Sequence, residues 1–366
     1  MKNTFGTSVA VTLFGESHGT MLGAVVDGLA PGVPVDEAFI AHQLSLRRPW
    51  GDVSTARVEP DRFQIVSGAF EGKTTGTPLT ILIPNENANS GDYAATRALA
   101  RPGHADYTAY AKYHGFEDYR GGGHFSGRVT AALVAAGAVA LTALRGRGVR
   151  IGTHIARCAG VSDAPFSENA DAEIAALNEK TFAVLDEARG EAMRAAIAEA
   201  AQEGDSVGGV LETLVTGVPA GVGEPWFDTL EGMLAHALFS IPAVKGVEFG
   251  DGFAMAEARG SACNDAFFMD GGQVRTKSNH NGGVNGGISN GMPLRVRCAV
   301  KPTPSIFKEQ QTVDFLRGED ASLALRGRHD PAIVHRARVV VDSVCALALC
   351  DALALRFGTD WLGGNA

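Results

Sequence analysis

Six short segments of this 366-residue sequence combine glycine with arginine, histidine, serine or aspartate, a combination that core packing does not explain. Arginine binds phosphate and carboxylate through a planar fork of N–H donors, histidine transfers protons near neutral pH, and glycine lets a ligand approach the backbone. The pattern therefore predicts binding of small molecules that carry several negative charges. The segments are residues 14–19, 47–49, 101–106, 120–128 and 278–289, and the pair 301–305 with 327–331.

His18 and His104 are the candidate proton-transfer residues. His18 stands between a serine and a glycine at the end of an apolar run, where a loop could present it to a ligand. His104 follows Arg101 by three residues in a Pro-Gly turn, a spacing that suits anion binding together with proton transfer. Each also has a plainer explanation. His18 could be a surface or core histidine with satisfied hydrogen bonds, and His104 could hydrogen-bond locally with Asp106.

Arginines form the second group of candidates. Arg47 and Arg48 are adjacent at the end of a predicted helix, with Arg57 downstream, and they either complement the helix dipole or form a fork for a phosphate or carboxylate. The segment from Arg120 to Arg128, RGGGHFSGR, is the strongest candidate. A helix is predicted to begin there, so that free N–H groups would face an anion. Arg128 would be unfavourable in the first turn of that helix unless an anion lay nearby.

The remaining segments are polar and glycine-rich. Residues 278–289, SNHNGGVNGGIS, are too polar for a core element, and they form either a loop that wraps around a polar ligand or a surface turn. Lys301 and Arg328 place further cations in the last pair of segments. Asp330 either joins this group or caps a final helix.

Familiar nucleotide and metal motifs fail on inspection. Residues 67–74, SGAFEGKT, lack the first glycine of a P-loop and lead into a strand, so a hairpin turn is predicted there. The triple glycine at 121–123 lacks the third glycine of a dinucleotide-binding motif. No histidine pair has HExxH spacing, and the five cysteines form no CxxC pair, so no metal site is predicted and free thiols are expected. The residues alone thus indicate an enzyme acting on phosphorylated or carboxylated small molecules, without naming its reaction.

Charge and hydropathy exclude several other classes. The net charge of −9 argues against a nucleic-acid partner or an anionic membrane surface. The longest apolar run, residues 129–144, is shorter than the roughly 20 residues that span a bilayer, so a buried helix is predicted and no membrane partner. The first residues lack a basic start and reach Glu16 early, which does not fit a signal peptide. Together with the free thiols, this favours a cytoplasmic protein.

Strands and helices that could position these segments alternate without the regularity of a parallel βαβ fold, so the α+β class is predicted, as a single domain over residues 1–366. Asp36 and Ser126 are the expected N-caps of two helices, Pro331 is the expected first residue of the last one, and residues 301–328 are expected to be mostly loop. Strands are predicted at residues 23–29, 63–70, 79–83, 206–217 and 294–300, and helices at 36–48, 126–144, 171–203, 227–239 and 331–357.

Taken together, the motifs closely resemble those of the chorismate synthase family. The matching stretches follow the family's order along nearly the whole chain: FGESHG, RPGHADYT, RGGGHFSGR, SNHNGG, NGGIS, KPTPSI and GRHDP. The resemblance implies a β-α-β sandwich of antiparallel sheets flanked by helices, assembled as a homotetramer. It also implies the conversion of 5-enolpyruvylshikimate 3-phosphate to chorismate, a 1,4-elimination of phosphate that requires reduced FMN and is the last common step toward the aromatic amino acids.

The resemblance also implies roles for individual residues. His104 would protonate or hold the reduced flavin in its anionic form, His18 would assist the departing phosphate, and Asp330 would act where the ring proton is removed. The substrate's anionic groups would be bound by Arg47, Arg48, Arg101 and Arg128. FMN would contact His124, Phe125, Ser126, Ala243, Gly286, Lys301, Pro302, Thr303, Pro304, Ser305 and Arg328.

Two other functions stay open at this point. One is a flavin-binding protein without lyase activity, against which the intact His18, His104 and Asp330 argue. The other is a relative that acts on a different enolpyruvyl phosphate. NADPH could reduce the flavin on this chain, but the lack of a nucleotide motif favours a separate source of reduced FMN.

Overall fold

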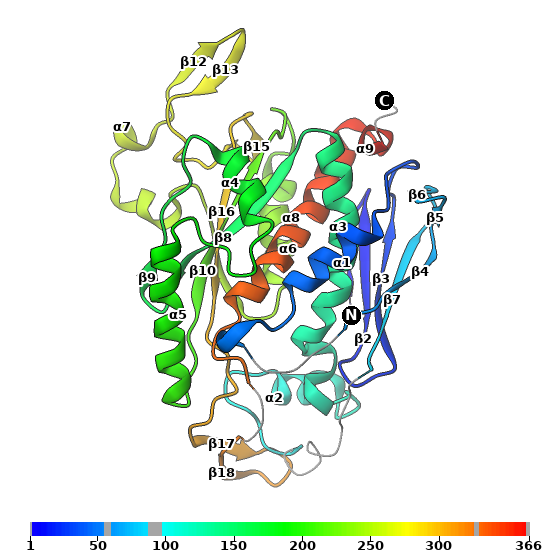
Figure 1. The fold of residues 1–366 in the computed structure, drawn as a ribbon, viewed down its shortest axis with the longest axis vertical. Helices are drawn as coiled ribbons and strands as arrows, with labels where there is room; N and C mark the ends of the chain where they lie inside the picture. Colours follow the sequence, from blue (N-terminus) through cyan, green and yellow to red (C-terminus); the bar gives the residue numbers. More distant parts are fainter. Residues whose placement is uncertain (1, 55–59, 87–96, 326–328, 364–366) are drawn as a thin grey trace.

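Two antiparallel sheets enclose a layer of helices in the computed structural model, which describes residues 2–54, 60–86, 97–325 and 329–363 (Figure 1). Each sheet has five strands, and the helices between them contact both. This arrangement confirms the predicted α+β class and the β-α-β sandwich. It also leaves the strand ends and the loops between layers to carry the glycine-rich segments.

The first sheet has the strand order β1-β2-β3-β7-β4. Its strands are β1 Thr4–Phe5, β2 Ala10–Gly15, β3 Met21–Asp27, β4 Gln64–Ser67 and β7 Leu79–Pro84. Alternate residues of β7 are buried against the helices, which is the period-2 pattern of a strand with one covered face. The P-loop-like residues form a small hairpin of β5 Ala69–Phe70 with β6 Lys73–Thr74, as predicted.

The second sheet has the order β11-β16-β10-β8-β9, and every pairing in it is antiparallel. The predicted strand at residues 294–300 is confirmed without a shift as β16 Leu294–Val300. The other strands are β8 Arg150–Cys158, β9 Val161–Ser162, β10 Gly209–Thr216 and β11 Val244–Phe249. Strands β8 and β11 were not predicted, because neither shows a clear alternation of apolar and polar residues.

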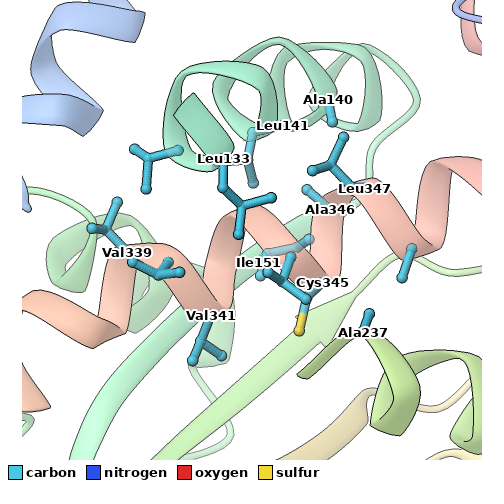
Figure 2. Packing of buried hydrophobic residues seen from close by; sticks show 14 of the residues in the cluster. Leu133, Ala140, Leu141, Ile151, Ala237, Val339, Val341, Cys345, Ala346 and Leu347 are labelled. Carbon is cyan, nitrogen blue, oxygen red and sulfur yellow. The ribbon is translucent and has the colours of Figure 1, made fainter. Parts of the chain in front are cut away.

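The core is centred on two long helices, α3 Thr130–Gly146 and α8 Val334–Phe357, which pack against each other between the sheets (Figure 2). Gly137 of α3 lies directly against Cα and Cβ of Ser343, so that any side chain at position 137 would overlap them. By length and composition, residues Gly127–Gly146 could cross a membrane, but 89% of the apolar window is buried within the protein. It is therefore a core helix, as predicted.

Helix α1 Glu37–Leu46 covers α3 and begins where expected, because the Asp36 carboxylate accepts a hydrogen bond from the Phe39 amide at 3.0 Å. Ser126 caps a short 3-10 turn, η3 Gly127–Val129, that leads into α3. The remaining helices are α2 Asp106–Tyr113, α4 Ala170–Leu177, α5 Glu187–Gln202, α6 Leu230–Phe239, α7 Gly260–Cys263 and α9 Asp360–Gly363, with 3-10 turns η1 Gly51–Val53, η2 Arg120–Phe125, η4 Trp226–Asp228 and η5 Gly252–Glu257.

One prediction about the last third of the chain was wrong, and another missed a hairpin. Helix α8 begins at Val334, not at Pro331, because the Pro331 carbonyl accepts a hydrogen bond from Val207 and is held in the loop. The described residues 301–325 are mostly loop, as predicted, but they also contain an antiparallel hairpin, whose polar strands gave no apolar alternation. Besides β5 with β6, the hairpins outside the two sheets are β12 Phe267–Asp270 with β13 Gln273–Thr276, β14 Val284–Asn285 with β15 Ile288–Ser289, and β17 Gln310–Asp314 with β18 Glu319–Leu323.

A buried histidine links β8 to β10 and to the loop after β9. His154 is 1% exposed, with Nδ1 at 2.8 Å from the Asp163 carboxylate and Nε2 at 3.4 Å from that of Glu212. Burial acts to lower the pKa of His154, but the hydrogen bonds to the two carboxylates outweigh it and raise the pKa. The charged imidazolium is therefore the form that stabilises the folded protein.

We expect the stabilising effect of His154 to depend on pH. Because its pKa is raised on folding, its contribution is complete below the unfolded value of about 6.5 and disappears as the pH rises through the folded value. The difference in unfolding free energy between the wild type and His154→Gln should thus be larger at pH 6 than at pH 9 in denaturant titrations. An equal difference at both values would contradict this assignment.

Candidate active site

His18 and His104 approach the same turn of three glycines. This turn, in η2, has positive φ angles at Gly121, Gly122 and Gly123, which few residues other than glycine adopt. A Cβ atom on Gly121 would overlap the His18 ring, and one on Gly122 would lie 3.3 Å from Nε2 of His104. The turn thus brings together two histidines that are far apart in the sequence.

The loop after β2 fixes the position of His18. The Ser17 amide donates to the Gly123 carbonyl at 3.1 Å, and the Ser17 hydroxyl lies within hydrogen-bond distance of the His18 Nδ1 and of two carbonyl groups of the glycine turn. His18 itself is 8% exposed. The imidazole is therefore held by the turn in a largely buried position.

His104 belongs to a second, tightly bonded group in the turn before α2. Its Nδ1 lies 2.9 Å from the Asp106 carboxylate, which also accepts hydrogen bonds from the Arg101 guanidinium at 2.6 and 2.7 Å. Although burial opposes ionisation, these hydrogen bonds hold the pKa of Asp106 well below its usual range. A carboxylate only accepts, so Nδ1 of His104 donates to it and Nε2 is left facing Gly122. The local hydrogen bonding considered for Asp106 is thus present and orients the imidazole.

Arg47, Arg48 and Arg128 meet around one buried carboxylate. Arg128 donates to Asp61, and Arg47 and Arg48 lie 3.8 and 4.0 Å from the other carboxylate oxygen. The anion expected beside Arg128 is therefore supplied by the protein. Arg128 also donates to the side chain of Asn85, whose amide donates to the carbonyls of Glu16 and Gly19 on either side of His18. The arginines and the histidine loop form one connected structure.

Asp330 joins this structure from the end of the chain. Instead of capping α8, it pairs with Arg336, whose Nε donates to the Arg47 carbonyl at 2.8 Å. Its neighbour His329 packs against the Phe307 ring, and burial together with the charge of Arg101 lowers the pKa of His329. Asp330 thus lies beside the helix end that carries the adjacent arginines.

The segment from Lys301 to Ser305 follows β16 and reaches the turn of His104. The Lys301 side chain donates to the Gly103 carbonyl, and its amide donates to the Ala243 carbonyl at 2.9 Å. A Cβ atom on Gly103 would lie 3.4 Å from Pro304, so that the proline packs on the same turn. Within the described part of the chain, Thr303 Oγ1 and His329 Nε2 are buried without a hydrogen-bond partner. Such atoms fit a polar ligand that is bound here.

The predicted cofactor contacts do not all lie together. His124 donates from Nδ1 to the Gly15 carbonyl at 2.8 Å, Phe125 contacts the Tyr113 ring, and Ser126 accepts from the Arg128 amide, so these three border the His18 loop. Pro302 and Ser305 belong to the same short segment as Lys301.

Gly286 is the exception. It lies in the β14–β15 turn, beside the start of β16, whereas Lys301 follows its end. At about 3.3 Å per residue, β16 is about 20 Å long, so the two residues lie toward opposite ends of an extended strand. Arg57 and Arg328 lie outside the described residues.

Among the described residues, we call the six that converge here the basic cluster: His18, Arg47, Arg48, Arg101, His104 and Arg128. Several guanidinium groups next to two oriented imidazoles can bind a ligand with more than one anionic group and exchange a proton with it. Charge neutralisation of this kind suits the departure of phosphate, which needs little acid catalysis but a strongly positive environment.

The chain matches the chorismate synthase family over residues 9–354. The chain belongs to that family. It is 46% identical over 359 residues to the chorismate synthase of Dehalococcoides mccartyi, an alignment that covers 98% of both chains. It is 47% identical to that of Methanosarcina mazei, covering 95% of both. A crystal structure of chorismate synthase superimposes with a TM-score of 0.76 at 29% identity and covers 97% of this chain and 94% of the other.

Membership of the chorismate synthase family supplies the reaction that the residues alone could not name. The chain is a carbon–oxygen lyase of aromatic amino-acid biosynthesis that forms chorismate from 5-enolpyruvylshikimate 3-phosphate. The substrate carries one phosphate and two carboxylates, and the basic cluster offers them four arginines. The family match therefore argues against the alternative that the chain acts on a different enolpyruvyl phosphate.

The sequence analysis missed three residues that contact the candidate site: Asp61, Asn85 and Arg336. Each touches a predicted residue across a long sequence separation, as Arg336 does with the Arg47 carbonyl. None lies in a glycine-rich segment, and a lone aspartate or asparagine carries no signal of its own. Only the tertiary structure brings them to the site.

Proposed function

We propose that the basic cluster is where this lyase binds its phosphorylated substrate together with reduced FMN. The observation that carries the proposal is the convergence of four arginines and two histidines from separate loops on the glycine turn of η2. Arg47, Arg48, Arg101 and Arg128 bind the phosphate and the carboxylates. As the C–O bond breaks, these guanidinium groups neutralise the charge that develops on the leaving phosphate.

The histidines and Asp330 handle protons in this proposal. His18, held through Ser17, protonates the departing phosphate, and His104, oriented by Asp106, presents Nε2 for proton exchange with the flavin. Asp330, held by Arg336, assists removal of the ring hydrogen. No side chain in the site is a strong electron donor, and reduced FMN, when bound, supplies that electron-rich partner.

Reduced FMN fits the polar surroundings of residues 301–305. The buried Thr303 hydroxyl and the His329 Nε2 offer hydrogen bonds to a polar ligand, and Lys301 adds a positive charge. His124, Phe125, Ser126, Ala243, Pro302, Pro304 and Ser305 complete the group that would hold the flavin, together with Arg328. Gly286 is proposed as a further flavin contact, although it lies near the opposite end of β16 from Lys301.

We propose further that the flavin arrives already reduced, and that NADPH is not oxidised by this chain. The one P-loop-like segment is a β-hairpin, which leaves no motif for a dinucleotide. We also propose one domain over residues 1–366 and a cytoplasmic location. A continuous buried core and the family match over residues 9–354 support the first, and five free cysteines support the second.

An anaerobic assay tests the function and the flavin source. The purified protein is mixed with 5-enolpyruvylshikimate 3-phosphate and chemically reduced FMN, and chorismate absorbance and released phosphate are followed. We expect equal amounts of both products, none with oxidised FMN, and none when oxidised FMN is supplied with NADPH. Flavin binding without product would instead indicate a cofactor site that has lost its chemistry, and turnover with NADPH would show an intrinsic flavin reductase.

We propose that the chain assembles as a homotetramer and that the β12–β13 hairpin takes part. The hairpin projects from the body of the protein (Figure 1), and Phe267, Met269 and Val274 are each more than half exposed on it. A two-stranded hairpin is marginal on its own, and clustered exposed apolar side chains mark contact surfaces.

Met269→Asp should therefore lower the mass measured by light scattering without unfolding the protomer. Gln273→Glu adds a charge to the same hairpin without removing an apolar contact, and it should leave the mass unchanged. A Met269→Asp protein that remains a tetramer would exclude the hairpin from the interface.

A further inference from the structure

Asp61 is the residue around which three arginines of the basic cluster are arranged. Its side chain is 1% exposed, and its carboxylate accepts a hydrogen bond from Arg128 and faces Arg47 and Arg48 at 3.8 and 4.0 Å. Three guanidinium groups this close repel one another, and the Asp61 carboxylate among them offsets part of that repulsion. The carboxylate therefore allows the three arginines to lie side by side.

The order of exposure shows which groups a ligand would meet. The Arg48 side chain is 37% exposed, those of Arg128 and Arg47 are 8% and 4% exposed, and Asp61 is the most buried. Asp61 is thus shielded from solvent, and Arg48 is the most accessible of the three arginines. A ligand entering from solvent would contact guanidinium N–H groups while Asp61 holds them from the protein side.

The backbone around Asp61 supports this role. Its φ angle of 47° is in the left-handed region, which aspartate tolerates better than most residues but which still costs free energy. The preceding carbonyl, that of Pro60, accepts a hydrogen bond from Arg48. The segment before β4 is therefore bonded to the arginines by both its main chain and its carboxylate.

The contacts of Asp61 extend to the histidine loop through Arg128. Nε of Arg128 donates to Asn85 at 3.1 Å, and Asn85 donates at 2.9 Å to the carbonyls on either side of His18. An Arg128 guanidinium released from Asp61 would lose the orientation that this chain of hydrogen bonds requires. The carboxylate is thus placed to set the geometry of the arginines.

We propose that Asp61 is a positioning residue for substrate binding. It holds Arg47, Arg48 and Arg128 in one arrangement so that their outward N–H groups receive the anionic groups of the substrate. It touches neither the substrate nor the flavin, so it acts on affinity and not on the chemical step. This inference rests on the proposed function of the basic cluster.

The test is the steady-state kinetics of Asp61→Asn, which keeps the size of the side chain and removes its charge. We expect KM for 5-enolpyruvylshikimate 3-phosphate to rise about 10-fold or more, with kcat within about threefold of the wild type. Inhibition by inorganic phosphate should weaken in parallel. Asp36→Asn is the matched control, because it makes the same change on the helix that precedes Arg47 and asparagine also caps helices.

Several outcomes would overturn the proposal. An unchanged KM would show that the arginines need no internal carboxylate, and a lower KM would make Asp61 a competitor of the substrate. A fall in kcat alone would place it in the chemical step. If Asp61→Asn does not fold, Asp61→Glu serves instead, because it keeps the charge but displaces it. KM should still rise in this variant. An unchanged KM would overturn the proposal.

A binding measurement separates this proposal from the proposed function. Calorimetry of inorganic phosphate and of the substrate on flavin-free protein requires no turnover. Weaker binding by Asp61→Asn would support Asp61 even if the wild type made no chorismate, a result that would contradict the proposed function alone. Equal binding by both proteins, with an active wild type, would contradict the Asp61 proposal alone.

Discussion

Replacing His104 with alanine should lower turnover by about 10²–10⁴-fold, the range usual for loss of a group that transfers a proton in the transition state. The imidazole is held at Nδ1 by Asp106, and its Nε2 faces the glycine turn that also carries His18. The neighbouring Arg101 is bonded to the same carboxylate, and a guanidinium does not give up a proton near neutral pH. The measurement is the anaerobic assay with reduced FMN, at saturating substrate.

The fold should survive this change. His104 lies in a turn outside the helical core, and the arginine–carboxylate pair of Arg101 and Asp106 remains without it. His42→Ala serves as a control, because it removes a histidine from the α1 surface, where its partners are Glu179 and Asn178. Near-normal turnover of His104→Ala, with unchanged mass and thermal unfolding, would refute the assigned role.

Particular elements show how much of the fold could be predicted from the sequence. Asp36 was predicted as an N-cap because it precedes a helical apolar pattern, and the structure has this hydrogen bond. Strand β16 was predicted correctly because its apolar residues alternate with arginines. By contrast, β17 and β18 are polar on both faces, and their pairing depends on contacts that no local pattern contains. Pro331 has the local signal of a helix start, but its hydrogen bond to Val207 prevents one.

The candidate site was also predicted only in part, because local patterns show its segments but not the contacts between them. Glycine-rich segments that carry histidine or arginine are visible one at a time, because each combines residue types that a core would not use. Their convergence is not visible, since His18, His104 and the glycine turn come from the ends of different elements. Asp61 was missed altogether, because a buried counter-charge has meaning only beside the arginines that it holds.

The glycine turn offers the sharpest test of that convergence. Gly121→Ala should reduce turnover about as strongly as removal of His18, by about 10²-fold or more. A Cβ atom at this position would overlap Cε1 and Nδ1 of the His18 ring and approach the Ser17 hydroxyl, so that the imidazole must leave its position. His18 itself is untouched by the substitution, and the loss would therefore report on its placement. The anaerobic assay measures this loss directly.

Two effects of Gly121→Ala must be distinguished: strain in the backbone at position 121 and displacement of the His18 ring. Gly121 has a φ angle of 58°, and alanine there costs about 1–2 kcal/mol by conformation alone. Gly148 has a φ angle of 80° after the end of α3, and no atom lies within 4 Å of the position that an alanine methyl group would take there, so Gly148→Ala carries the strain without the overlap. We expect both variants to lose similar stability and only Gly121→Ala to lose activity. Equal activity in the two would mean that His18 does not need the position that the glycine turn gives it.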